Sequence, residues 1–257
     1  MKLIHSRDNP FYKELTKLAS SARHRNKTKK TFLDGTHLLA AYLDIGGVPQ
    51  HILLNTSALQ NDEITTLLDR LDRVPITQLD DNLFAELSEL STPTGILALI
   101  EPPSASRTSE NRFVLLLEDI QDPGNLGSMI RSAAAAGCEA VFLSKGCADV
   151  WSPKVLRAAM GGHFALSIFD NQDLHNVAKT FSGTCLASSL QATHSLYDCD
   201  LSGSVAFMVG NEGAGLSSKL SYLATKKINI PMSGQVESLN VAAATAICLF
   251  EVVRQRK

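Results

Sequence analysis

The strongest constraint on the fold is a repeated alternation of short apolar runs and helical stretches in the second half of the chain. Six runs are typical of buried strands: Phe113–Leu117, Ala140–Leu143, Ala165–Ile168, Thr184–Ala187, Val205–Val209 and Lys227–Ile230. Four stretches have helical character: Asn125–Ala136, Pro153–Met160, Asp173–Phe181 and Asn240–Arg254. Continuous apolar strands are expected in parallel sheets covered on both faces. The pattern predicts a doubly wound α/β domain that binds its ligands beyond the carboxyl ends of the strands.

A second, smaller α/β domain is expected at the start of the chain. Helical stretches (Thr36–Ile45 and Asn61–Leu71) alternate there with strand-like runs (His51–Leu54 and Gly95–Ile100). The following stretch, Glu101–Arg112, is rich in proline, serine and charge, which is typical of a linker. A chain of 257 residues is long enough for two domains. We therefore predict domains over residues 1–100 and 113–257, joined by a linker over 101–112.

Charge is distributed very unevenly along the chain. Residues 1–30 contain nine lysines and arginines against two acids, a net charge of +7. The remaining residues contain 15 basic and 24 acidic side chains, a net charge of −9. A basic arm on an acidic protein favours a polyanionic partner such as nucleic acid. The alternative is a solvated surface helix followed by a flexible, lysine-rich loop.

Several classes of protein do not fit the sequence. It has no apolar run long enough to span a membrane, and its first residues lack the apolar core of a secretory signal. The five cysteines include no C-x-x-C pair, and the seven histidines lack metal-ligand spacing. We expect a cytoplasmic protein without a metal site or membrane segment. Trp151 is either a platform for a nucleic-acid base or an interior anchor.

Three loops are candidates for a ligand-binding site. The first, Glu118–Arg131, follows a predicted strand. Pro123 and Gly124 force a turn, and Asn125 can cap the next helix. Because helical side chains lean toward the N-terminus, Arg131 is expected to lie over Gly127, where no side chain competes for space. The alternative is a plain capped turn with a surface arginine.

The second loop, Gly210–Gly215, directly follows another predicted strand. Its glycines allow the backbone to approach a ligand closely. They occupy the first, fourth and sixth positions, which is not the dinucleotide-binding spacing, and the ending of a P-loop is missing. A carboxylate at Glu212 suits a cationic or hydroxyl-bearing ligand better than a phosphate. The alternative is a tight structural turn.

The third loop, Ile228–Val241, leads into an alanine-rich helix. Pro231 ends the strand, and Ser238 or Asn240 can cap the helix. The loop combines polar side chains with apolar ones, as small-ligand pockets do. The polar residues are Glu237, Ser238 and Asn240, and the apolar ones are Ile230, Met232 and Leu239. The alternative is a simple strand–loop–helix connection.

Together these segments resemble the three motifs of the SpoU (TrmH-type) branch of the SPOUT RNA methyltransferases. The residues that carry the resemblance are Asn125, Gly127 and Arg131, the turn Gly210–Gly213, and Ile230–Met232 followed by Ser238–Val241. The first domain resembles the L30e-like substrate-binding domain often fused to this family, mainly through Phe32–Leu38. Two departures are Asp34, where the family more often has glutamate, and Ala159, where serine is more usual.

The resemblance implies a C-terminal α/β domain with a parallel sheet and a trefoil knot, S-adenosylmethionine as cofactor, and a homodimer. Carried over to this chain, the cofactor-binding residues are Gly210, Asn211, Ile230, Met232 and Leu239. Arg131 becomes the catalytic residue beside the ribose. Asn125, Glu212, Ser238 and Asn240 shape a site between two subunits.

The activity implied is methyl transfer to a ribose 2′-hydroxyl, so the substrate is RNA, because DNA lacks this group. We favour 23S-type ribosomal RNA, since the L30e-like fusion is commoner among ribosomal RNA enzymes. Transfer RNA is the alternative substrate, and a non-catalytic RNA-binding relative is the alternative protein class. A nucleotide-dependent dehydrogenase is disfavoured by the glycine spacing. Because a guanidinium stays protonated in proteins, Arg131 is expected to stabilise the developing alkoxide as a cation and not to act as a general base.

Overall fold

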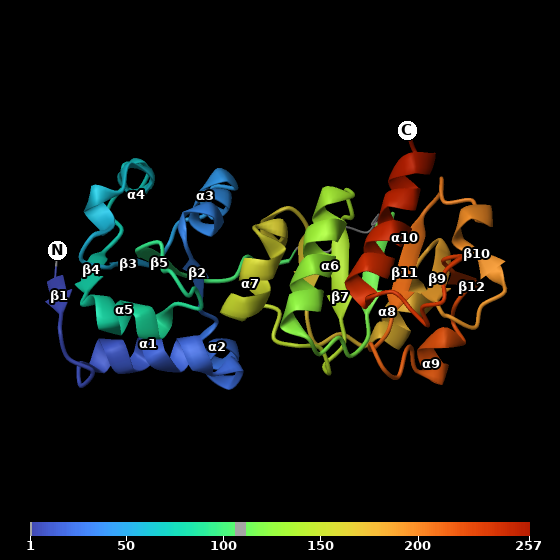
Figure 1. Ribbon diagram of the computed structural model, residues 1–257, viewed down its shortest axis with the longest axis horizontal. Helices are drawn as coiled ribbons and strands as arrows, with labels where there is room; N and C mark the ends of the chain where they lie inside the picture. The colour runs from blue at the N-terminus through green and yellow to red at the C-terminus, as the bar shows by residue number, and fades with distance from the viewer. Residues whose placement is uncertain (1, 106–111) are drawn as a thin grey trace. The chain divides into compact units, whose positions relative to one another are not determined.

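The computed structural model describes residues 2–105 and 112–257, which form two compact units (Figure 1). Residues 106–111 of the expected linker lie outside the described part of the chain. The first unit contains the chain up to Ser104 together with Trp151–Phe164. The second contains Ala105–Val150 and Ala165–Lys257. Within the described ranges, no helix is long and apolar enough to span a membrane.

The first unit is a five-stranded sheet with helices on both faces. Its strand order is β1 (Lys2–Ile4), β4 (Ile76–Leu79), β3 (His51–Leu54), β5 (Ile96–Ile100) and β2 (Thr31–Asp34). β5 runs antiparallel to both of its neighbours, while β1, β4 and β3 are parallel. Its helices are α1 (Pro10–Ser20), α2 (Ala22–Thr28), α3 (Thr36–Asp44), η1 (Ala58–Gln60), α4 (Asp62–Leu68), α5 (Asp81–Leu87), α7 (Pro153–Ala159) and η2 (Gly162–Phe164).

Successive residues of each strand point to opposite faces of this sheet, so the first unit has a hydrophobic core on each face. Ile52 and Leu54 of β3 pack with α3 and α4, whereas Leu53 packs with α1 and α5. β5 divides its residues in the same way, as the two-residue period of a strand requires. The predicted helix Asn61–Leu71 begins one residue later and ends at Leu68, and the predicted strand His51–Leu54 is confirmed.

The segment Trp151–Phe164 belongs to the first unit by its packing. Leu156 is fully buried in the core on the α3 side of the sheet. The Thr31 hydroxyl donates to the carbonyl of Trp151 at 2.6 Å, and the Arg157 guanidinium donates to the carbonyl of Glu89 at 2.8 Å. Trp151 is half-buried against the same core, which favours the anchor over the base platform.

The second unit is a seven-stranded, entirely parallel sheet, which confirms the predicted α/β class. Its order is β10 (His194–Ser195), β12 (Lys226–Asn229), β9 (Thr184–Ser188), β11 (Val205–Val209), β6 (Phe113–Leu117), β7 (Ala140–Leu143) and β8 (Ser167–Phe169). Its helices are α6 (Pro123–Ala135), α8 (Leu174–Thr180), η3 (Leu196–Asp198), α9 (Ser218–Ser221) and α10 (Val241–Gln255). The trefoil knot stays a prediction, because strand order and pairing do not describe how the chain is threaded.

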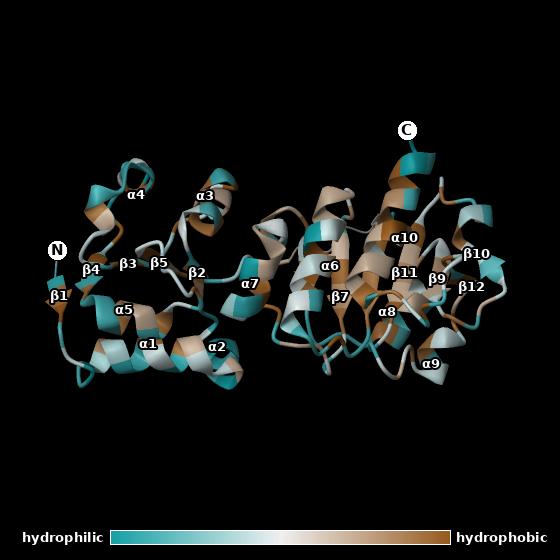
Figure 2. Cartoon of the chain, in the orientation of Figure 1, coloured by the Kyte–Doolittle hydropathy of each residue, from teal (hydrophilic) through white to brown (hydrophobic). Residues whose placement is uncertain are grey.

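Helices cover both faces of this sheet, and its central strands β6, β7 and β11 are apolar and buried along their whole length (Figure 2). α8 and α9 pack on one face through Leu174, Ala178 and Leu220. α6 and α10 pack against each other, and Figure 1 shows them side by side in front of the sheet. This contact brings the N-terminus of α6 near that of α10, although more than 100 residues separate them in the sequence.

Candidate active site

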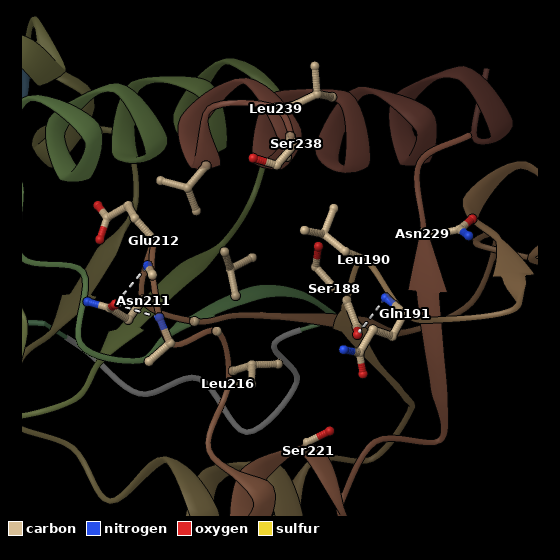
Figure 3. Close-up of a pocket in the computed structure, with 18 of the residues that line it drawn as sticks. Ser188, Leu190, Gln191, Asn211, Glu212, Leu216, Ser221, Asn229, Ser238 and Leu239 are labelled. Carbon is tan, nitrogen blue, oxygen red and sulfur yellow. Dashed lines mark hydrogen bonds between the residues drawn. The ribbon is translucent and has the colours of Figure 1, made fainter. Parts of the chain in front are cut away.

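A cleft of about 970 Å³ opens beyond the carboxyl ends of β9, β11 and β12, where parallel sheets bind their ligands (Figure 3). The residues after these strands supply most of its walls, and the N-termini of α6 and α10 complete it. The cleft is lined by nine of the ten residues that the motifs point to: Asn125, Gly210, Asn211, Glu212, Ile230, Met232, Ser238, Leu239 and Asn240.

The loop after β11 is closed by its own backbone. A Cβ atom on Gly210 would lie 2.2 Å from the carbonyl carbon of Gly215, so only glycine fits there. The Asn211 side-chain oxygen accepts from the backbone of Gly213 and Ala214 at 2.9 and 3.0 Å. Its amide donates to the carbonyl of Asp119 at 3.0 Å. Asn211 therefore shapes the turn, so the tight-turn interpretation and the ligand-site interpretation both apply to this loop.

Three side chains form a hydrogen-bonded chain at one end of the cleft: Asn125 in the first turn of α6, Glu212 in the loop after β11, and Asn240 at the N-cap of α10. The cap of α6 is Asp122 and not Asn125, as the sequence had suggested. The Asn240 amide donates to the side-chain oxygen of Asn125 at 2.9 Å, and the Asn125 amide donates to a Glu212 carboxylate oxygen at 3.1 Å. The donor-to-acceptor direction of these hydrogen bonds is fixed at α10. The Asn240 side-chain oxygen accepts from the free N–H groups in the first turn of that helix, so its amide is left to donate. The Asn125 amide is therefore turned toward the carboxylate.

A carboxylate after β6 links two of the loops. Glu118 accepts from both the backbone and the hydroxyl of Ser217, each at 2.7 Å. Ser217 is also the N-cap of α9, where its hydroxyl oxygen accepts from the backbone N–H of Leu220. The end of β6 is thus joined to the start of α9, where the loop that carries Glu212 ends.

Arg131 is the one predicted site residue that does not line the cleft. It lies on α6 with an exposed side chain, and within the described part of the chain it forms no ion pair. It lies six positions after Asn125, and at about 100° per residue the two side chains leave α6 in different directions. Gly127 is buried in α6, and Glu237 is exposed outside the cleft lining.

The far wall of the cleft contains residues that the sequence did not single out. Ser188 ends β9, Leu190 and Gln191 follow it, and Tyr222 and Lys227 also line the cleft. The predicted strand Thr184–Ala187 could have pointed to Ser188, Leu190 and Gln191, because ligands bind beyond the carboxyl ends of parallel strands. No motif marks these residues. Among the described residues, no group of three or more histidine, cysteine, aspartate or glutamate side chains could hold a metal ion.

Comparison with known proteins agrees with the motifs and with the fold. The description of the SpoU rRNA Methylase family matches residues 112–250, and that of the MRM3-like substrate binding domain matches residues 9–98. The chain is 34% identical over 254 residues to the 23S rRNA (guanosine(2553)-2′-O)-methyltransferase RlmP of Bacillus subtilis (strain 168). This match covers 98% of the chain and 99% of the relative.

Two solved structures share the whole architecture. A crystal structure of an RNA 2′-O ribose methyltransferase superposes with a TM-score of 0.85 at 30% identity, covering 99% of each chain. The SpoU methyltransferase AviRb from Streptomyces viridochromogenes, solved in complex with the cofactor AdoMet, gives 0.86 at 26% identity over 96% of this chain and 98% of its own. With its parallel sheet, its three motifs around one cleft and these relatives, the chain belongs to the SpoU rRNA methylase family.

Proposed function

We propose that this protein methylates a ribose 2′-hydroxyl of ribosomal RNA, with S-adenosylmethionine as the methyl donor. The observation that carries the proposal is the Asn125–Glu212–Asn240 chain at one end of a cleft in a SpoU family member. RlmP, the relative of similar length, is named for this reaction on 23S ribosomal RNA. The reducing cytoplasm is the proposed location, which the five free cysteines support.

The cleft fits the donor in size and chemistry. Its volume of about 970 Å³ is near the upper end of small-ligand pockets. Ile230, Met232 and Leu239 offer apolar walls for an adenine, beside the backbone of the Gly210 loop. Glu212 supplies a carboxylate that attracts a positively charged ligand. When bound, the donor supplies a methyl group that is already activated by its sulfonium charge.

The protein's share of the reaction is to place the ribose and to remove its proton. Amide groups such as those of Asn125 and Asn240 suit a hydroxyl-bearing ligand, and positioning alone contributes a large part of most rate accelerations. Glu212, the one carboxylate among the lining residues, would accept the hydroxyl proton as the 2′-oxygen takes the methyl group and the donor's carbon–sulfur bond breaks. Ser238 lies beside this end of the cleft and completes its polar rim.

We further propose that the protein acts as a homodimer in which Arg131 serves the cleft of the second copy. α10 exposes a stripe of small and apolar residues at helical spacing, Ala243, Ala246, Ile247 and Phe250, and Phe250 is 47% exposed. An exposed apolar face next to the cleft is typical of an interface. Arg131 on the neighbouring helix would then stabilise the alkoxide as a cation.

The two parts of the chain divide the work in this proposal. Residues 1–100 bind RNA, 101–112 connect, and 113–257 transfer the methyl group, as the two family descriptions support. Five of the nine basic residues in 1–30 lie on α1 or α2, so this part of the chain is not an extended arm. Arg25 is buried and donates to the carbonyls of Leu18 and Ala19, so it is structural. Exposed Arg23, Lys27 and Lys29, which cluster on and just after α2, are among the cations available to RNA.

The decisive experiment maps 2′-O-methyl groups in RNA from cells with and without the gene. We expect one ribosomal RNA position to lose its methyl group, and the purified protein to restore it with labelled S-adenosylmethionine. A lost mark on transfer RNA would correct the substrate. If calorimetry detects no binding of S-adenosylmethionine and no ribose mark is lost, the protein is a non-catalytic relative and the proposal fails.

A further inference from the structure

A second hollow lies beside the cleft, at the open edge of the second unit's sheet. It has a volume of about 370 Å³ and is formed by the turn before β10 and by the start of β12. β10 is only two residues long and pairs with Ile228 and Asn229, so the outer side of β12 is left uncovered at Lys226 and Lys227. We refer to this feature as the edge hollow.

One ridge separates the edge hollow from the cleft. Gln191 and Lys227 line both cavities. An extended ligand that occupies the cleft can therefore cross this ridge and enter the edge hollow. A single small cofactor does not need the second cavity, because the first is already near the upper end of small-ligand pockets.

The chemistry of the edge hollow is that of an anion site. Lys226, Lys227 and His194 supply its cationic or titratable groups, and no aspartate or glutamate lines it. Thr193, Thr225 and Gln191 add hydroxyl and amide donors. The Thr225 hydroxyl accepts from the backbone of Cys185 and keeps its own proton for another acceptor.

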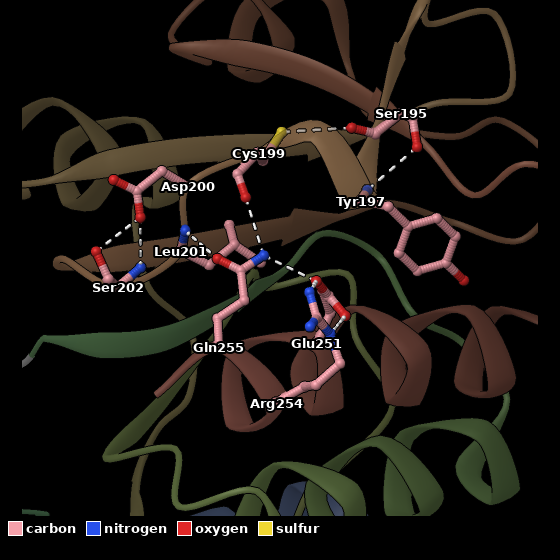
Figure 4. A network of polar contacts seen from close by, with 9 residues as sticks. All are labelled: Ser195, Tyr197, Cys199, Asp200, Leu201, Ser202, Glu251, Arg254 and Gln255. Atoms are coloured by element: carbon pink, nitrogen blue, oxygen red, sulfur yellow. Dashed lines mark hydrogen bonds and ion pairs between the residues drawn. The ribbon is translucent and has the colours of Figure 1, made fainter. Parts of the chain in front are cut away.

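The two lysines are available to a ligand. Several other cations of the protein are paired with acids, among them Arg7 with Glu86, Lys13 with Asp8 and Arg254 with Glu251. Neither Lys226 nor Lys227 forms an ion pair within the residues that the structure describes. Asp200 is close enough for Lys226 to help lower its pKa, after the larger effect of hydrogen bonds from Ser202. Those bonds, at 2.6 and 3.0 Å, hold the Asp200 carboxylate within its own turn (Figure 4).

We propose that the edge hollow binds a backbone phosphate of the substrate RNA, on the strand that carries the methylated nucleotide. This inference rests on the proposed function, because it takes RNA as the ligand of the neighbouring cleft. An RNA strand presents phosphates at regular intervals, and lysines neutralise them without reading sequence. The second unit would then hold the RNA itself, and not only the cofactor.

The test is the salt dependence of RNA binding by the full-length protein with Lys226→Gln. The probe is a short oligouridylate, followed by fluorescence anisotropy, with Lys179→Gln on α8 as control. Lys179 is also exposed, and it lines neither cavity. For a lost contact to single-stranded RNA we expect the slope of log K against log salt to flatten by about 0.7. The control keeps the wild-type slope.

Further measurements separate the possible outcomes. Calorimetry with S-adenosylmethionine should give the same affinity for Lys226→Gln as for the wild type, which shows that the variant is folded. The His194 imidazole signals should shift with micromolar oligouridylate but not with inorganic phosphate at the same concentration. An equal response to inorganic phosphate would assign the hollow to a free anion and overturn the proposal.

An unchanged slope in Lys226→Gln, or an equal change in Lys179→Gln, would also overturn the proposal. Failure of the proposed function gives a different result: the protein binds oligouridylate with a Lys226-dependent slope, yet no ribose in ribosomal RNA loses its methyl group when the gene is removed.

Discussion

At the scale of single residues, Asp34 is the clearest case of a buried acid without full compensation. One carboxylate oxygen accepts from the Ser88 hydroxyl at 2.7 Å and from the Glu89 backbone at 2.9 Å. The other is buried and accepts no hydrogen bond from the described residues. Burial raises the pKa of Asp34, although the two hydrogen bonds and the charge of Arg157 oppose the shift.

This pKa predicts how stability depends on pH. The folded state holds the Asp34 proton more tightly than the unfolded state, whose carboxyl has a pKa of about 3.9. Stability should therefore fall as pH rises from about 4 through the raised pKa, and then level off. Asp34→Asn removes this contribution, so urea unfolding over that range should show a flatter pH dependence. Equal pH dependence in the two proteins would contradict the assignment.

Asn240 has two functions that can be separated by substitution. Its oxygen caps α10, and its amide orients Asn125 toward Glu212. Asn240→Ala removes both, and we expect a loss of roughly 0.5–2 kcal/mol of stability. Asn240→Asp keeps an oxygen at the helix N-terminus, where negative charge is favourable, but it cannot donate to Asn125.

We therefore expect Asn240→Asp to be as stable as the wild type and to transfer methyl groups at least ten times more slowly. Urea unfolding and initial rates measure the two effects. If the aspartate variant were fully active, the hydrogen bond to Asn125 would have no part in placing the ribose.

At the scale of elements, the apolar stripe on α10 makes the dimer testable. A buried phenylalanine contributes about 1.5–3 kcal/mol, and in a two-fold interface each copy contributes one. Phe250→Glu should weaken the dimer by about tenfold or more. Sedimentation velocity measures this, with Lys219→Glu on α9 as a surface control. A wild-type protein that sediments as a monomer at tens of micromolar would refute the homodimer.

The elements also show where sequence reasoning succeeds. Strands such as Phe113–Leu117 and Val205–Val209 were predicted with their observed bounds, because burial on both faces leaves a continuous apolar run. β10 was missed because two residues have no period to detect. The hydrogen bond between Asn125 and Asn240 could not be predicted either, since it depends on the packing of α6 against α10 and not on local sequence.

At the scale of the whole molecule, the charge asymmetry predicts how RNA is held. Deleting residues 1–30 is a poor test, because Tyr12, Leu15 and Leu18 of α1 are buried in the core of the first unit. Replacing the exposed cations is better. The variant Arg23→Gln, Lys27→Gln, Lys29→Gln should bind ribosomal RNA more weakly, with a flatter salt dependence. Its affinity for S-adenosylmethionine should not change; equal RNA binding would exclude this surface.

The helix Pro153–Met160 was predicted from its pattern to within one residue of α7, but its packing partner was not. Periodicity shows that one face of a helix is buried, without showing against what. Val155, Leu156 and Ala159 are fully buried, and Leu156 lies in the core of the first unit. The chain therefore leaves the second unit after Val150 and returns to it at Ala165.

One consequence concerns attempts to cut the protein into separately expressed pieces. A fragment of residues 113–257 carries α7 without the core that buries Leu156. We expect trypsin to cleave this fragment rapidly after Lys154 or Arg157 and the intact chain slowly there. Equal protection would show that α7 folds without its partners. The first unit is encoded in two separate stretches of the gene, so a chimera that exchanges RNA-binding units between relatives must exchange both.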